Sequence, residues 1–173
     1  MALELFLTIS GVTGGCKSRT HKGWFSLSSY HWVLARSRQR GSEGSAARLV
    51  TTGNELKVVK RVGIESAALM ELCATGKSSA QAQISIAPAA ARREVAQKHV
   101  LIRLGDVYVK SITTLAEQID GFLTEELVLM FKKLEFNHHP ILDLSESSMG
   151  AESDDQLFSW DFVSRRGAAP AVV

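Results

Sequence analysis

Apolar and polar side chains alternate with period two along most of the chain, which is the pattern of strands that bury one face. The first such segment, residues 2–9, places its aliphatic side chains on a single face: Leu3, Leu5, Leu7 and Ile9. The same alternation predicts further strands over residues 24–36, 56–62, 81–88, 99–113, 125–138 and 156–163. Gly105-Asp106 predicts a bulge or a tight bend inside one of them.

Only residues 65–75 change to helical spacing. The apolar positions that define this period are Leu69, Met70, Leu72 and Cys73. Glu65 or Ser66 can cap the N-terminus, and Gly76 suits the C-terminal end. A helix this short needs a sheet to lie on, so we expect the side chains of Leu69, Met70 and Leu72 to be buried against one.

Seven or eight strands with a single helix exclude a doubly wound α/β fold, because the alternation of strands and helices is missing. The predicted fold class is therefore mainly β: an antiparallel barrel of two packed sheets with one short helix. We expect one domain over residues 1–163 and a loose C-terminal tail over 164–173.

Residues 36–48 have no apolar periodicity and are rich in Arg, Ser and Gly, which predicts a long mobile loop. Its arginines could contact phosphate or an acidic protein surface: Arg36, Arg38, Arg40 and Arg48. A solvated loop is the simpler interpretation, because no aromatic side chain is interleaved for base stacking.

The stretch from Gly11 to Phe25, GVTGGCKSRTHKGWF, resembles a phosphate-binding loop, with Lys17 and Ser18 in the expected order. Cys16 stands where the loop requires its second glycine, and its Cβ would obstruct the approach of a phosphate. The residues that follow alternate as a strand, whereas phosphate binding needs a helix N-terminus there. We therefore interpret the stretch as a turn between two antiparallel strands.

The composition is that of an ordinary soluble protein of 173 residues, with a mean hydropathy of +0.03. Its 20 basic and 18 acidic side chains balance too evenly to indicate nucleic acid binding. No apolar stretch reaches the roughly 18 residues of a membrane span, so we expect no membrane insertion. Glu4 interrupts the first apolar segment and no basic region precedes it, so no cleavable signal peptide is expected. We interpret Cys16 and Cys73 as reduced and structural.

No pattern of residues predicts catalysis, a cofactor or a metal site. His138 and His139 are adjacent at the end of a predicted strand and point to opposite sides, which is poor geometry for one ion. His21 and Cys16 are close in sequence, but nothing nearby completes a set of three or four ligands. No G-x-S-x-G elbow supports a serine hydrolase. The expectation is a protein that is not an enzyme.

Taken in order, these elements resemble the Hcp proteins, the haemolysin-coregulated proteins of bacterial type VI secretion. The family opens with a strand, a loop of the form I-x-G-[VI]-x-G-x-x-K, a histidine and a strand that bears a tryptophan. The matching positions here are Ile9, Gly11, Val12, Gly14, Lys17, His21 and Trp32. The family's helix motif is carried by Ser66, Leu69 and Gly76, and its T-E strand begins at Thr124 and Glu125. The resemblance extends to about Val163.

The resemblance implies a tube subunit rather than a nucleotide-binding enzyme. Hcp proteins form homohexameric rings that stack into the inner tube of a contractile machine, and the tube is expelled with the spike into a target cell. It implies self-association, contacts with spike, sheath and effector proteins, and a protein that lies in the bacterial cytoplasm before firing and is then secreted. Effector cargo could lie in the lumen of the ring.

Self-contact needs surface that a single barrel cannot bury. Segments such as 24–33 and 127–136 carry apolar or aromatic side chains on both faces, so neighbouring subunits should cover part of them. We therefore predict a subunit or ring interface at five residues: Trp24, Trp32, Arg36, Arg38 and Arg40. Two alternatives remain from other classes: a monomeric barrel that binds an apolar small molecule, and, more weakly, a P-loop enzyme.

Overall fold

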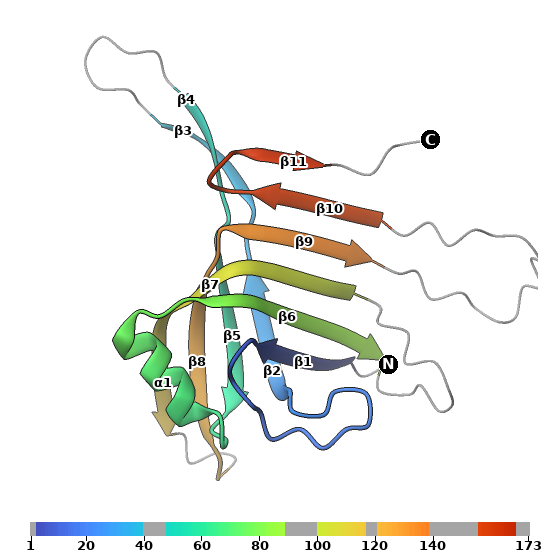
Figure 1. Ribbon diagram of the computed structural model, residues 1–173, viewed down its shortest axis with the longest axis vertical. Coiled ribbons are helices and arrows are strands. Elements are labelled where there is room, and N and C mark those ends of the chain that lie inside the picture. The colour runs from blue at the N-terminus through green and yellow to red at the C-terminus, as the bar shows by residue number, and fades with distance from the viewer. Residues whose placement is uncertain (1–2, 40–47, 89–99, 117–120, 139–155, 169–173) are drawn as a thin grey trace, which may run out of the picture.

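Six antiparallel strands close into a barrel, and three further strands extend its sheet along one side (Figure 1). The computed structural model of the chain describes residues 3–39, 48–88, 100–116, 121–138 and 156–168. The barrel consists of β1 (Leu3–Ile9), β2 (Phe25–Trp32), β5 (Glu55–Arg61), β6 (Ser79–Pro88), β7 (Val100–Ala116) and β8 (Leu123–Met130). The extension consists of β9 (Lys133–His138), β10 (Gln156–Asp161) and β11 (Arg166–Ala168). The mainly β fold with a barrel is thus confirmed.

The long strand β7 joins the barrel to the extension. It pairs with β6 on one side, while β9 and β8 share its other side, β9 over Val100–Gly105 and β8 from Tyr108 onward. Between these two partners lies Asp106, whose φ of 52° is rare for a residue with a side chain. The bend predicted at Gly105-Asp106 is therefore confirmed, and it marks the point at which the strand changes partner.

The barrel interior is filled with aliphatic side chains from all six of its strands. Fully buried residues such as Leu7, Ile84, Ile102 and Leu127 belong to one continuous cluster. The predicted period of two is confirmed here, since buried and more exposed positions alternate along β5 and β8. Burial of this apolar cluster supplies the main free energy that holds the fold together.

A bulge changes the face that β2 buries. The register of β2 against β5 shifts between Leu27 and Ser29. Before the shift Phe25 and Leu27 are buried, whereas after it Tyr30 and Trp32 pack against the core. The strand predicted over 24–36 is present as β2 over Phe25–Trp32, and the extra residue in the bulge reverses the alternation beyond it.

Three other predictions differ from the structure. Residues 36–39 and 48 of the expected loop belong to two paired strands, β3 (Ala35–Gln39) and β4 (Arg48–Thr52), while residues 40–47 lie outside the described part of the chain. The expected strand 125–138 is two strands, because the chain turns at Phe131 and Lys132, whose N–H groups bond to Asn54 and Gly105. The expected loose tail contains β11, which pairs with β10.

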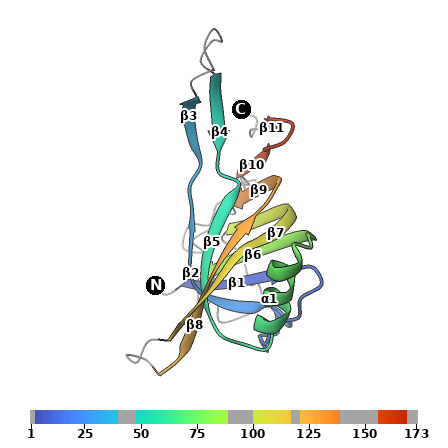
Figure 2. The same ribbon diagram turned by 90° about the vertical axis from the view of Figure 1, so that its left-hand side faces the viewer.

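The helix α1 (Ser66–Thr75) lies beside the barrel against β7 (Figure 2). Gly76 ends it in the left-handed region with φ of 65°, as predicted. Leu69 is fully buried, but Leu72 is only half-buried and Met70 is 43% exposed. The prediction that all three are buried is therefore wrong for Met70 and only partly right for Leu72, because so short a helix turns a narrow face to the sheet.

Candidate functional site

The loop between β1 and β2 is a closed turn and does not cradle phosphate. The N–H groups of Gly14 and Cys16 bond to the carbonyl oxygens of Gly23 and Trp24, and β2 follows instead of a helix. A Cβ on Gly14 would overlap the Trp24 carbonyl, and Gly11 has φ of 86°, so both positions favour glycine for steric reasons. Lys17 is exposed. These two N–H groups are therefore used within the subunit, and the loop lacks the helix N-terminus that the P-loop interpretation requires.

His21 fastens this loop to the outer face of the sheet. Its ring is 2% exposed and stacks on Phe6 with ring centres 4.2 Å apart, while Trp24 meets it edge-on at 4.9 Å. Its Nε2 is hydrogen-bonded to Ser85 Oγ at 3.0 Å and its Nδ1 to Thr20 Oγ1 at 2.9 Å. Ser85 is itself fully buried beneath the loop, so this Ser–His contact is structural and offers no nucleophile to a substrate.

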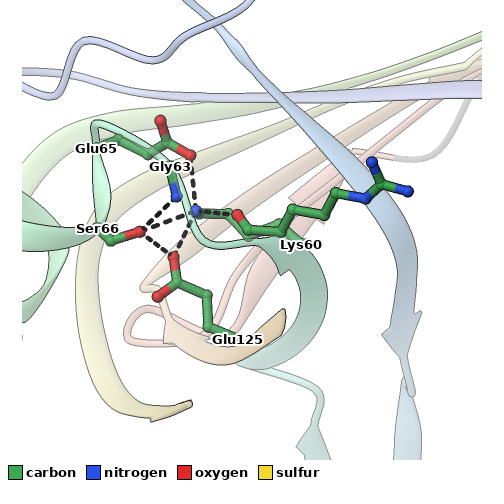
Figure 3. Close-up of polar contacts among 6 residues, drawn as sticks. Lys60, Gly63, Glu65, Ser66 and Glu125 are labelled. Atoms are coloured by element: carbon green, nitrogen blue, oxygen red, sulfur yellow. Dashed lines mark hydrogen bonds and ion pairs between the residues drawn. The ribbon is translucent and has the colours of Figure 1, made fainter. Parts of the chain in front are cut away.

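A cluster of buried charges joins α1 to the barrel (Figure 3). The ammonium group of Lys60 forms ion pairs with Glu65, at 2.6 Å, and with Glu125. The Ser66 hydroxyl donates to Glu125 Oε1 at 2.6 Å and accepts the N–H of Gly63 at 3.0 Å. The side chains of Lys60 and Glu125 are fully buried and that of Glu65 is 5% exposed. We call these four side chains, Lys60, Glu65, Ser66 and Glu125, the Lys60 cluster.

The β3–β4 hairpin projects from the barrel at one end of the long axis (Figures 1 and 2). Its strands pair only with each other, so both outer edges are open in the described part of the chain. Arg36 and Arg38 are exposed on one face of β3, opposite Thr51 and Leu49, and Leu49 is 53% exposed. The predicted interface arginines therefore lie on a strand, while Arg40 falls outside the described residues.

The two predicted interface tryptophans make contacts within the subunit. Trp32 is half-buried, and its indole N–H donates to the carbonyl oxygen of Gly53 at 2.6 Å, at the base of the hairpin. Trp24 is half-buried against His21. Sequence reasoning did not find a set of exposed apolar side chains between β5 and α1 and at the start of β8, which we call the apolar rim: Val62, Ile64, Phe122 and Leu123. Arg61 lies over the Phe122 ring at 3.7 Å.

Acid–base and metal chemistry find little support in the described residues. No group of three or more His, Cys, Asp or Glu among them is placed to hold a metal ion. Asp161 is a turn residue whose pKa lies below the ordinary 3.8, first because its carboxylate accepts the N–H of Ser164 and then that of Val163. No helix in the part of the chain that the structure describes is long and apolar enough to cross a membrane.

Comparison with known proteins agrees with this architecture. The family described as "Type VI secretion system effector, Hcp" matches residues 6–138. Protein hcp1 of Pseudomonas aeruginosa is 26% identical over 140 residues, which are 81% of this chain and 85% of that protein. Hcp1 of Salmonella typhimurium superposes with a TM-score of 0.72 at 17% identity, covering 97% of this chain and 100% of that chain. A type VI secretion system effector from Yersinia pestis gives 0.65 at 16% identity, covering 91% and 98%.

At such low identities the solved structures establish the fold alone, whereas the family match spans well over half of the residues. The resemblance to the Hcp proteins drawn from the sequence is thereby confirmed. Gly11, Gly14, Lys17, His21, Gly76 and Glu125, which carried that resemblance, all lie within the matched range. The chain belongs to the Hcp family, the tube proteins of the type VI secretion system.

Proposed function

We propose that this chain forms a homohexameric ring, that its rings stack into a tube, and that the tube is expelled from the cell and can hold effector cargo in its lumen. The observation that carries the proposal is the β3–β4 hairpin, whose edges and exposed arginines have no partner within the described part of the subunit. An isolated two-stranded hairpin is at best marginally stable in water. Open edges also invite pairing with another chain, so a neighbouring copy is the natural cover.

The position of the hairpin supports contacts that repeat. The β3–β4 hairpin lies toward one end of the long axis, and β8 begins toward the other end (Figure 2). Leu123 is the first residue of β8 and its carbonyl oxygen accepts the N–H of Val62, so the apolar rim belongs to that second end. Two different patches on one subunit allow a heterologous interface, in which each copy offers one patch to the next copy. Such an interface closes into a ring or continues as a filament. A tube made of stacked rings needs contacts between subunits within a ring and contacts between one ring and the next.

The finer assignments follow from this arrangement. We place the polar, salt-sensitive part of the interface at Arg36, Arg38 and Arg40, with the exposed portions of Trp24 and Trp32 contributing apolar area. Residues 1–163 act as one domain and perform no catalysis of their own. The chain's partners are further copies, then the spike, sheath and effector proteins of the machine. It lies in the bacterial cytoplasm before firing and is then secreted.

Light scattering on the purified chain tests the assembly. A ring of six should give six times the chain mass of 18.8 kDa. A chain that stays monomeric at high concentration and low salt would refute the tube proposal and favour the ligand-binding barrel. That alternative has little structural support, because the barrel interior is already filled by the aliphatic cluster around Leu7, Ile84 and Ile102.

Charge reversal tests the hairpin. The variant Arg36→Glu/Arg38→Glu/Arg40→Glu should weaken ring closure or stacking, yet leave the unfolding midpoint of the subunit unchanged, since exposed charges contribute little to folding. The matched control replaces the same three residues with lysine, which keeps the charge and should assemble as the natural protein does. If the glutamate variant and the lysine control assemble equally well at low salt, the hairpin arginines are not part of the interface.

A further inference from the structure

The Lys60 cluster replaces the last apolar layer at one end of the barrel. Three cross-strand pairs between β5 and β8 are buried in succession: Leu56 with Leu129, Val58 with Leu127, and Lys60 with Glu125. The first two pairs are aliphatic, and the third is an ion pair at an equally buried position. A third aliphatic pair would fit the pattern of both strands, so the charged pair needs an explanation other than burial.

The helix that covers this layer is poorly fixed by apolar contacts alone. Its ten residues are too few to form a stable helix without tertiary contacts. Leu69 is its only fully buried aliphatic side chain, Leu72 and Cys73 are half-buried, and Met70 is exposed. Apolar side chains thus lie on more than one side of α1. Because apolar attraction is non-directional, a small rotation or shift of α1 would exchange one set of contacts for a similar one.

The first turn of α1 supplies the directional contacts that apolar packing lacks. Ser66 donates to Glu125 on β8, and Glu65 pairs with Lys60 on β5. The Glu65 carboxylate also folds against Gly63, where a Cβ would come within 2.6 Å of its Oε1. Hydrogen bonds and ion pairs hold only within a narrow range of distance and angle. Contacts to two strands at once therefore define both the rotation and the axial position of α1 (Figure 3).

The composition of the cluster does not favour maximal stability. One lysine faces two carboxylates, and Glu125 Oε2 is buried without a hydrogen-bond partner among the described residues. Taking charges out of water costs free energy that their mutual attraction often fails to offset, so well-packed apolar replacements of buried ion pairs are often neutral or stabilising. Removal of a single partner is nevertheless strongly destabilising, since it leaves a buried charge uncompensated.

We propose that the Lys60 cluster is a positional lock: it selects one placement of α1 on the barrel, at a cost in stability relative to an apolar layer. The lock also holds the turn before α1, which carries Val62 and Ile64 of the exposed rim. Lys60, Glu65, Ser66 and Glu125 act as positioning residues for that surface. The inference concerns the isolated subunit and does not depend on ring formation.

Three variants of the full chain test the lock. The broken variant is Lys60→Met, which leaves two buried carboxylates without their counter-ion. The neutral variant is Lys60→Met/Glu65→Gln/Ser66→Ala/Glu125→Met, which removes every charge of the cluster. The surface control is Lys57→Met/Glu126→Gln, which removes the 2.9 Å ion pair on the outer face of the same two strands, where the side chains are 47% and 29% exposed. Each is compared by urea unfolding and by NMR with amide hydrogen exchange.

We expect the broken variant to unfold at much lower urea concentration, and the neutral variant at a concentration equal to or above that of the natural protein. In the neutral variant, amides of α1 should exchange about tenfold faster or more, and Leu69 should show more than one set of resonances. The surface control should change neither measurement. A neutral variant with a single Leu69 resonance set and unchanged α1 exchange would overturn the lock. A neutral variant as unstable as the broken one would also overturn it, because the cluster would then be a net source of stability.

Discussion

Replacement of His21 by alanine should destabilise the subunit by roughly 2 to 6 kcal/mol. The ring is almost fully buried between Phe6 and Trp24, and aromatic contacts of this kind contribute about 0.5 to 1.5 kcal/mol each beyond burial. The substitution also leaves the fully buried Ser85 hydroxyl without its imidazole partner, and such an orphaned group costs about 1 to 3 kcal/mol. The aromatic packing and the hydrogen bond to Ser85 are lost together, because the same imidazole ring makes both.

A double-mutant cycle separates them. Ser85→Ala alone should cost about 1 kcal/mol, and His21→Ala/Ser85→Ala should cost less than the sum of the single changes by about 1 kcal/mol, because no orphaned hydroxyl remains. Urea unfolding followed by far-ultraviolet circular dichroism measures all four corners, and the exposed neighbour Lys22→Ala serves as the control. A loss below about half a kcal/mol for His21→Ala, or strict additivity in the cycle, would show that His21 does not fasten the loop as described.

Two further predictions concern α1 and the β10–β11 turn. Leu69→Ala should cost about 2 to 5 kcal/mol because the side chain is fully buried, whereas Leu72→Ala should cost less than about 2 kcal/mol because it is half-buried; equal losses in urea unfolding would contradict the placement of α1. The Asp161 carboxylate stabilises its turn while it is ionised, and its pKa in the folded protein lies below 3.8, so this stabilisation is present above pH 3.8 and is lost as the pH falls through the lowered pKa. The Ser164 amide should therefore be protected from hydrogen exchange above pH 3.8 and lose this protection as the pH falls through the lowered pKa of Asp161. Loss of the protection above pH 3.8 would contradict the prediction.

The strands and the helix could be predicted because their signals are local. Alternation over residues 2–9 and 56–62, and helical spacing that ends at Gly76, depend on only a few neighbouring residues. Errors arose where the alternation changes phase. Leu127, Leu129 and Phe131 are buried at odd positions, but Leu134 is buried at an even one, and this change of phase was the available signal for the turn between β8 and β9. A search for Gly or Pro misses such a turn because it contains neither.

The hairpin β3–β4 was missed for a different reason. Both of its faces are largely exposed, so its strands need no apolar alternation and their sequence resembles a loop. The Lys60 cluster was missed because partners 65 residues apart in sequence meet only through the register of β5 and β8. A signal was nevertheless present: Lys60 continues the inward positions Leu56 and Val58, so a charged side chain stood at a place where the period of two requires burial.

The residues that carried the family resemblance serve mainly to shape the subunit. Gly14 admits a close backbone crossing, His21 fastens the first loop, Gly76 ends the helix, and Glu125 belongs to the Lys60 cluster. These contacts are internal, so a sequence can match the family through them and still differ in what its surface binds. The exposed hairpin and the apolar rim lie outside this set of residues. Contacts with neighbouring subunits can therefore differ between proteins of one fold while the barrel stays the same. Experiments on assembly should for this reason change Arg36 and Arg38 rather than the motif residues.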